Sequence, residues 1–247
     1  MASATGACWT GWVRVADPGA TFDLGIDTAS DDASLAVFRA GDDEPMAVRR
    51  FRPETTMSRE LLGELSAFLA AAGVDRTAIG RIAVTTGPGQ YGPLRSGIAV
   101  AQGMAMALDA PLAGVGRFEA DAMLVDAEGQ TVIAVHETRS GPAWAAFETS
   151  GDVPREVVPA SVTSYAEAAA QAPRPAVWTG EVGPEHEALT AAQDAEGRAG
   201  DTIAAEPRTP RAVAIVRIAR VRGTFGDPAG VDAIYLRPPS ITRPRAQ

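Results

Sequence analysis

The order of predicted elements repeats along this chain, and that repeat constrains the fold more than any single motif does. The first half runs strand, strand, strand, helix, strand, helix, over residues 22–27, 33–39, 46–52, 58–73, 81–86 and 94–108. The second half follows the same order, over residues 131–137, 143–149, 155–158, 164–172, 176–180 and 209–225. No sequence identity links the two halves, so the repeat is one of architecture.

A repeat of this kind predicts an α/β fold made of two tandem lobes. Short turns between the first three strands favour an antiparallel meander, and the nearly all-apolar fourth strand is typical of a central parallel strand. Residues 1–21 carry no clear periodicity and are expected to form a loose extension. We place the first lobe at 22–120, the second at 121–208, and a C-terminal helix and tail at 209–247, packed back on the first lobe.

Composition excludes several classes of function. The 247 residues carry a formal net charge of −9, whereas nucleic-acid-binding proteins usually show a basic excess, so we do not expect this chain to hold RNA alone. All 22 basic residues are arginine, which excludes the lysine-containing phosphate loop and a Schiff-base lysine. The single cysteine, Cys8, allows no disulfide within the chain. We see neither a secretory leader nor an apolar run of about 20 residues, and expect a cytoplasmic protein without membrane contact.

Two turns that follow buried strands are candidates for binding an anion or a metal. Asp27 ends the first strand, where a carboxylate can hold a metal, and the Thr28 hydroxyl could donate to a phosphate. The simpler interpretation is an Asx turn, in which Asp27 accepts from local amides. Gly87 and Gly89 form a turn before a helix, whose amides and dipole could bind an anion with help from Arg95. Here the simpler interpretation is that the glycines permit a tight turn.

Covalent and metal-dependent chemistry find little support in the sequence. The chain has two histidines, His136 and His186, and no G-x-S-x-G elbow, so a catalytic triad is not expected. Neither an H-E-x-x-H nor an H-x-x-x-H spacing occurs, and there is no cysteine pair. We therefore expect no catalytic residue and no metal ligand.

The two helices of the first half have wide apolar faces that could serve a partner as well as the core. Part of each face must pack on the chain's own sheet, but neighbouring pairs such as Leu61 with Leu62 widen the apolar surface. Small and flexible residues on the second helix are of the kind used in helix–helix contacts. The partner-interface candidates are Leu61, Leu62, Leu65, Phe68, Leu69, Leu94, Ala101, Met104, Ala105 and Leu108.

Five segments, taken in order, resemble the TsaB family, also called YeaZ-like proteins. The most specific lies at 82–115, where a G-P-G-x-x-x-x-L-R-x-G signature precedes a small-residue helix and a P-L-x-G-V strand. The others match the opening strand pair, the first helix, a second-lobe hairpin and a Y-L-R-x-P ending, at residues 24–38, 58–74, 137–147 and 234–239. The resemblance covers most of residues 22–239.

The sequence also departs from the family pattern. Met57-Ser58 stands where the family helix usually begins His-Ser, and Pro93 replaces a glycine of the signature. Glu137 stands where the family commonly has Asp. The second-lobe turn lacks a D-x-G motif, and residues 178–181 make a poor adenosine loop. These changes bear on partner and ligand contacts more than on the fold.

The resemblance implies a fold of two tandem RNase H-like lobes, the architecture of the actin, sugar-kinase and Hsp70 ATPases. In active members, turns from both lobes cradle phosphates, whereas here only the first turn is of that kind. With only one of the two phosphate-binding turns present, the resemblance implies weak or no ATP binding. The phosphate-turn candidates would then be vestigial; they are Asp27, Thr28, Gly87, Gly89 and Arg95. On that interpretation the Gly87 turn shapes the chain and positions the following helix for a partner.

The resemblance further implies a non-catalytic role beside other subunits. TsaB pairs with TsaD, which carries the metal and the active site, and with the ATPase TsaE they transfer a threonylcarbamoyl group to the adenosine beside the anticodon of certain tRNAs. We expect no cofactor on this chain by itself, ATP and metal on the partner subunits, and contact with tRNA only through the complex. The first two helices of each partner would form a bundle, and a homodimer through the same helices would compete.

Three other functions stay open at this point. One is a bare structural module with some other partner, which the altered signature allows. A small-molecule kinase or ATPase of the same superfamily would use Asp27 as its catalytic carboxylate, and tight ATP binding by the isolated chain would favour it. A metalloprotease-like enzyme is disfavoured, because the spacing of metal ligands is missing.

Overall fold

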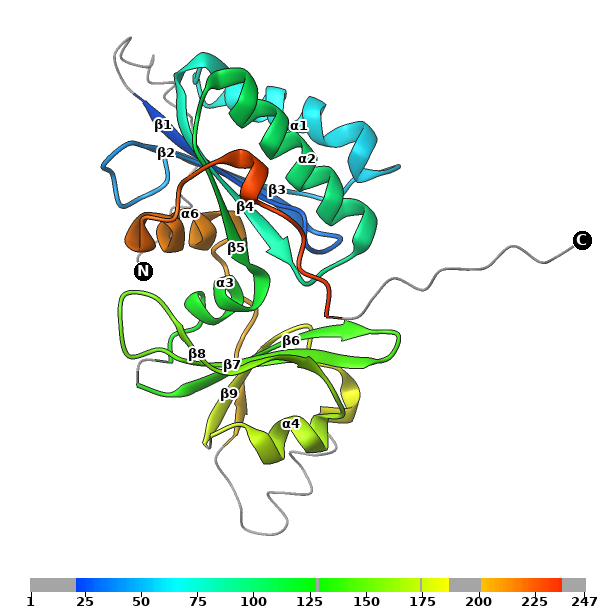
Figure 1. Ribbon diagram of the computed structural model, residues 1–247. Helices are drawn as coiled ribbons and strands as arrows, with labels where there is room; N and C mark the ends of the chain where they lie inside the picture. Colours follow the sequence, from blue (N-terminus) through cyan, green and yellow to red (C-terminus); the bar gives the residue numbers. More distant parts are fainter. Residues whose placement is uncertain (1–20, 128, 174, 187–200, 237–247) are drawn as a thin grey trace, which may run out of the picture.

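The computed structural model describes residues 21–127, 129–173, 175–186 and 201–236. Figure 1 shows two β-sheets one above the other, with a short helix between them. The predicted N-terminal extension at residues 1–21 lies outside the described residues, except for Thr21.

The first sheet has five strands in the order β3-β2-β1-β4-β5. The β1–β2 and β2–β3 pairs are antiparallel, whereas the β1–β4 and β4–β5 pairs are parallel. Its strands are β1 (Phe22–Asp27), β2 (Ala33–Arg39), β3 (Ala47–Phe51), β4 (Ile79–Gly87) and β5 (Leu112–Gly116).

Helices cover both faces of this sheet. Two of them, α1 (Met57–Ala71) and α2 (Tyr91–Leu108), lie side by side on one face and bury apolar side chains against β1 and β4. The helix α6 (Arg211–Arg222), from the far end of the chain, covers the opposite face. Because both faces are covered, all six residues of β1 are buried and the strand does not alternate.

Gly25 sets how closely α6 approaches the sheet. A Cβ atom at this position would lie 2.3 Å from the carbonyl oxygen of Ala212 and 2.9 Å from Cγ2 of Val216. Glycine therefore lets the helix backbone rest directly on β1. This contact fixes the start of α6 over the carboxyl end of the strand, where the candidate site lies.

The second sheet repeats the strand order of the first. Its order is β10-β9-β6-β7-β8, so its first strand again lies between its second and its fourth. The β6–β7 and β7–β8 pairs are antiparallel, whereas β6–β9 and β9–β10 are parallel. Its strands are β6 (Thr131–Thr138), β7 (Gly141–Glu148), β8 (Arg155–Val162), β9 (Ala176–Gly180) and β10 (Thr202–Ile203).

In the described part of the chain, α4 (Tyr165–Gln171) and α3 (Arg117–Met123) lie on opposite faces of the second sheet. The helix α4 packs Tyr165 and Ala168 against Trp144 and Trp178. Its start is fixed by a capping box, in which Ser164 accepts from the amide of Glu167 and the Glu167 carboxylate accepts from the amide of Ser164. The opposite face packs on α3.

The helix α3 lies between the two lobes. Its Ala120 packs with α6 and the first sheet, while Phe118 and Ala122 pack with the second sheet. The matching strand orders confirm the predicted fold class of two tandem RNase H-like lobes. The lobe boundary at residue 120 stays a prediction, because the helix that contains it contacts both sheets.

Several elements differ in length from their sequence-based bounds. The helix α2 begins at Tyr91 rather than Leu94, because Pro93 is tolerated in a first turn where no intrahelical donor is needed. The strand β8 extends to Val162, and α6 ends at Arg222, where Gly223 adopts a left-handed conformation (φ 61°). The described residues also form two short 3₁₀ helices, η1 (Arg76–Ala78) and η2 (Pro228–Gly230), and a helical stretch at 184–186.

Candidate functional site in the interlobe cleft

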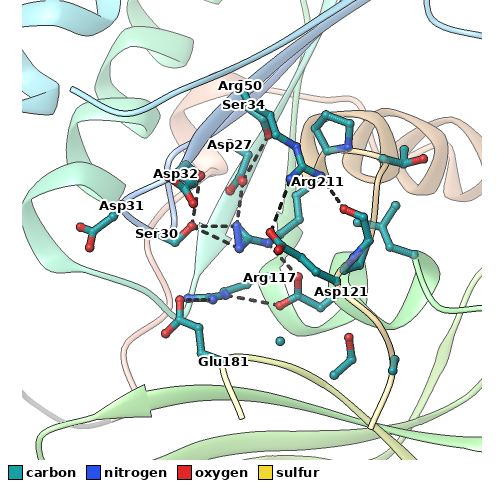
Figure 2. Close-up of a pocket in the computed structure, with 18 of the residues that line it drawn as sticks. Asp27, Ser30, Asp31, Asp32, Ser34, Arg50, Arg117, Asp121, Glu181 and Arg211 are labelled. Carbon is teal, nitrogen blue, oxygen red and sulfur yellow. Dashed lines mark hydrogen bonds and ion pairs between the residues drawn. The ribbon is translucent and has the colours of Figure 1, made fainter. Parts of the chain in front are cut away.

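A cleft of about 550 Å³ lies between the lobes. It opens where β1 and β9 end and α3 and α6 begin, and Figure 2 shows the charged side chains that line it. The lining includes six carboxylates and four arginines, namely Asp27, Asp31, Asp32, Asp121, Glu181 and Glu206 with Arg50, Arg52, Arg117 and Arg211. Residues 187–200 lie outside the described residues.

Asp27 stands at the centre of the first-lobe side of the cleft, and its carboxylate is fully engaged. Oδ1 accepts from the amide of Ala29 (3.1 Å) and the hydroxyl of Thr85 (2.8 Å). Oδ2 accepts from the hydroxyl of Ser34 (3.4 Å) and from Nη1 of Arg211 (2.9 Å). A carboxylate offers about four acceptor positions, so these four donors leave Asp27 little capacity for a metal or a water.

Arg211 fills the space in front of Asp27. Its Nη1 binds Asp27, its Nε binds Oδ1 of Asp121 at 2.7 Å, and both Nη atoms reach the hydroxyl of Ser30 at 3.1 and 3.2 Å. Burial lowers the pKa of this guanidinium, but the charges of Asp27 and Asp121 outweigh burial and raise it. Arg211 therefore supplies a permanent cation at the end of β1.

Arg117, at the start of α3, is a second cation in the cleft, and its side chain is 0% exposed. Its Nε lies 3.4 Å from Oδ2 of Asp121 and its Nη2 lies 2.6 Å from Oε1 of Glu181. Nη1 is 3.4 Å from the carbonyl oxygen of Ala29 and 2.9 Å from Nδ1 of His136. One guanidinium thus contacts the first-lobe turn, its own helix and the second lobe.

Glu181 follows β9 and closes the second-lobe side. Its Oε2 lies 2.6 Å from Nδ1 of His136 on β6. Burial raises the pKa of Glu181, but the hydrogen bond from His136 and the charge of Arg117 outweigh burial and lower it to about 2. Nδ1 of His136 accepts from Arg117 when it carries no proton, and it donates to Glu181 when it does.

The predicted phosphate turns pack on each other. The hydroxyl of Thr28 donates to the carbonyl of Pro93 at 2.9 Å, and the amide of Gln90 donates to the carbonyl of Ala29 at 3.3 Å. A Cβ at Gly89 would lie 2.2 Å from that same carbonyl oxygen. The glycine turn and the Asp27 turn are therefore in direct contact with each other.

Arg95, the fifth phosphate-turn candidate, contacts aromatic side chains of α2 and of the C-terminal segment. Its Nε donates to the hydroxyl of Tyr235 at 2.7 Å, and its guanidinium lies over the rings of Tyr91 and Tyr235. Gly87 adopts φ 99°, which a residue with a Cβ rarely adopts. The structure thus brings Asp27, Thr28, Gly87 and Gly89 together, whereas the Arg95 side chain binds Tyr235.

Most partner-interface candidates lie inside the chain's own core. The buried ones are Leu61, Leu65, Phe68, Leu69, Leu94, Ala101 and Ala105. Met104 and Leu108 are partly buried against the same core, and Leu62 is 57% exposed. The inner faces of α1 and α2 therefore pack on the sheet, and a partner would meet their outer faces instead.

Those outer faces are apolar and formed largely of small residues. Leu62 on α1 and Met106 on α2 are the large apolar side chains exposed there, and Met106 is 76% exposed. Small residues that are also exposed on these two helices are Gly63, Ser66, Ala67, Ala70, Ala99, Gly103 and Ala107. We call this set, with Leu62 and Met106, the outer α1–α2 face.

Sequence reasoning missed the residues that fill the cleft. Arg117 and Asp121 are four residues apart on α3, a spacing that signals an ion pair on one helical face. Arg211 follows Pro210 at a helix start, which gave no signal of its own.

Among the described residues, no group of three or more His, Cys, Asp or Glu side chains is arranged to hold a metal ion. In the described part of the chain, every helix is too short or too polar to cross a membrane.

The fold and this cleft define a class, the two-lobed proteins with RNase H-like lobes around a polar cleft. Within that class, YeaZ from Pseudomonas aeruginosa is a structural neighbour, with a TM-score of 0.68 and 20% identity over 87% of this chain and 100% of that chain. A second P. aeruginosa structure, described as an uncharacterized protein similar to peptidase YEAZ, matches with the same TM-score and identity. The resemblance to the YeaZ-like family is confirmed at the level of the fold.

Sequence comparison adds a related family. A family model described as TsaD, tRNA N6-adenosine threonylcarbamoyltransferase, matches residues 54–175. Proteins of that name from Geotalea uraniireducens and Nitratidesulfovibrio vulgaris (strain DP4) are 47% identical over 57 residues and 34% identical over 123 residues. These matches cover 23% and 44% of this chain but only 17% and 34% of the relatives. The chain thus spans about a third or less of the curated relatives it matches.

Proposed function

We propose that this chain is a non-catalytic, cytoplasmic scaffold subunit that pairs with a larger TsaD-like transferase in the threonylcarbamoylation of tRNA. The observation that carries the proposal is the occupied cleft. A carboxylate that ends a buried strand can hold a metal or orient a water, whereas here Asp27 accepts four hydrogen bonds from the protein itself. The similarity to YeaZ structures and to the TsaD family model supports the assignment to tRNA modification.

The partner surface in this proposal is the outer α1–α2 face. Its small residues let another helix pair approach closely, and Leu62 and Met106 supply apolar contacts. The exposed Arg59, one helical turn before Leu62, adds a charge beside this face. The partner is a TsaD-like subunit that carries the metal and the active site. A TsaE-like ATPase joins that complex, and tRNA is reached only through it, in keeping with the net charge of −9. Self-pairing through the same face is the competing state when the chain is alone.

The small-molecule kinase alternative is not favoured by the cleft. A kinase would need the Asp27 carboxylate free to accept a proton or bind a metal, and Arg211 lies 2.9 Å from it. Turnover of ATP that is lost in Asp27→Asn would nevertheless restore that alternative.

The proposal is tested by co-elution with the TsaD-like protein of the same organism on a sizing column, with and without ATP. A joint peak for the wild-type chain, lost in Leu62→Asp and in Met106→Asp, supports the scaffold role and its surface. Val221→Asp is the matched control, because Val221 is also an exposed apolar residue on a helix (54% exposed) but lies on α6, away from this face. Separate peaks for the wild type under all conditions would overturn the proposal.

A further inference from the structure

The charged groups of the cleft form one continuous chain of alternating sign. It runs Asp27, Arg211, Asp121, Arg117 and Glu181 (Figure 2). Beyond Glu181 it reaches His136. The successive nitrogen–oxygen distances from Asp27 to His136 are 2.9, 2.7, 3.4, 2.6 and 2.6 Å. We call these six residues the ion chain.

The ion chain crosses from one lobe to the other. Asp27 ends β1 of the first sheet, and Arg211 begins the helix that covers that sheet. Asp121 and Arg117 lie on α3 between the lobes. Glu181 follows β9, and His136 lies on β6 of the second sheet. Each ion pair therefore joins two different elements, except the one within α3.

Burial separates most of this ion chain from the ordinary surface pairs of the protein, whereas Glu181, its link to the second lobe, is 41% exposed. The side chains of Asp27, Asp121 and Arg117 are 7% exposed or less, and that of Arg211 is 17% exposed. By contrast, Arg217 on the same helix α6 binds Glu44, which is 84% exposed. Buried charges interact through a medium of low dielectric, so removing one partner leaves the next without compensation. Exposed pairs contribute little and are screened by salt.

A further contact ties the segment before α6 to the first lobe. Arg50, on β3, donates through Nη2 to the carbonyl oxygens of Pro207 (2.6 Å) and Arg208 (3.1 Å). The chain returning from the second lobe is thereby held against the first sheet just before Arg211. The position of Arg211 in the cleft does not depend on its ion pairs alone.

We propose that the ion chain is an internal latch that fixes the relative orientation of the two lobes, with Arg211 as a built-in cation beside Asp27. A protein whose lobes close around a bound ligand needs that ligand to bridge the cleft. Here side chains of the protein bridge it, so the lobes keep one orientation without a ligand. With this orientation fixed, the surfaces of the two lobes would keep the same relative position for a partner that binds them.

The test measures the distance between the lobes in solution. Spin labels are placed on cysteines at Thr224, after α6, and at Ala170, on α4, in a background with Cys8→Ser; both positions are exposed. Glu181→Gln removes a link on the second-lobe side, where the side chain is 41% exposed, and so spares the core. Asp121→Asn removes the carboxylate between the two arginines. Glu44→Gln is the matched control, since it removes the carboxylate that pairs with Arg217 within the first lobe.

The latch predicts a single narrow distance distribution for the unmodified chain and for Glu44→Gln. It predicts a broader or displaced distribution for Glu181→Gln and for Asp121→Asn, each checked to be folded by circular dichroism. Folded Glu181→Gln and Asp121→Asn proteins with the distribution of the unmodified chain would overturn the proposal, as would a broad distribution in the unmodified chain. Should Asp121→Asn not fold, Glu181→Gln alone decides.

Discussion

Replacing Gly25 by alanine tests how the C-terminal helix is seated on the first sheet. The added Cβ would lie 2.3 Å from the backbone oxygen of Ala212, whereas non-bonded heavy atoms rest at about 3.5–4 Å. The start of α6 would therefore have to move by about 1 Å. That helix buries seven side chains between Ala212 and Ala219, so movement opens gaps around all of them.

Overpacking of this kind costs about 1–3 kcal/mol of unfolding free energy. For a protein of this size, 1 kcal/mol lowers the melting temperature by about 2–4 °C, so Gly25→Ala should lower it by about 2–12 °C. Thermal unfolding followed by circular dichroism measures the change.

Gly63→Ala is the matched control, because the same methyl group is added where nothing lies within 4 Å. Gly63 is inside α1, and alanine there favours the helix by about 0.5–1 kcal/mol. The two substitutions should therefore move the melting temperature in opposite directions. A Gly25→Ala protein as stable as the wild type would refute the close seating of α6 on β1.

Three further predictions concern the helix faces and the cleft. Phe68→Asp, which buries a charge in the first core, should unfold the isolated chain, whereas Leu62→Asp should leave its circular dichroism spectrum and melting temperature nearly unchanged. Arg211→Gln should lower the unfolding free energy by about 3–5 kcal/mol in urea titrations, because the buried Asp27 loses its cation and Asp121 keeps only Arg117, while Arg217→Gln should change it by less than about 1 kcal/mol. The depressed pKa of Glu181, about 2 against 4.5, stabilises the fold above pH 4.5, and this contribution is lost as the pH falls towards 2; Glu181→Gln should flatten the pH dependence of stability in that range.

The sequence determined the order and type of the elements. Apolar patterns located β1, α1 and β4, because a continuous apolar run or a helical stripe of apolar side chains is a local property. The repeated order then predicted two related lobes, and the strand orders of the two sheets agree with it. The Asp27 turn was also visible, since a carboxylate that ends a buried strand is readable from a few neighbouring residues.

Only the tertiary structure decided what covers each apolar face and what fills the cleft. From the sequence, Leu65 and Phe68 could belong either to the core or to a partner interface, because an amphipathic stripe does not say which surface it meets. In the structure, the first sheet covers both residues. Arg211 lies 184 positions from Asp27, and nothing in either local pattern links them. Their pairing follows from α6 returning to β1 at Gly25, which brings a guanidinium to a buried carboxylate that requires a cation.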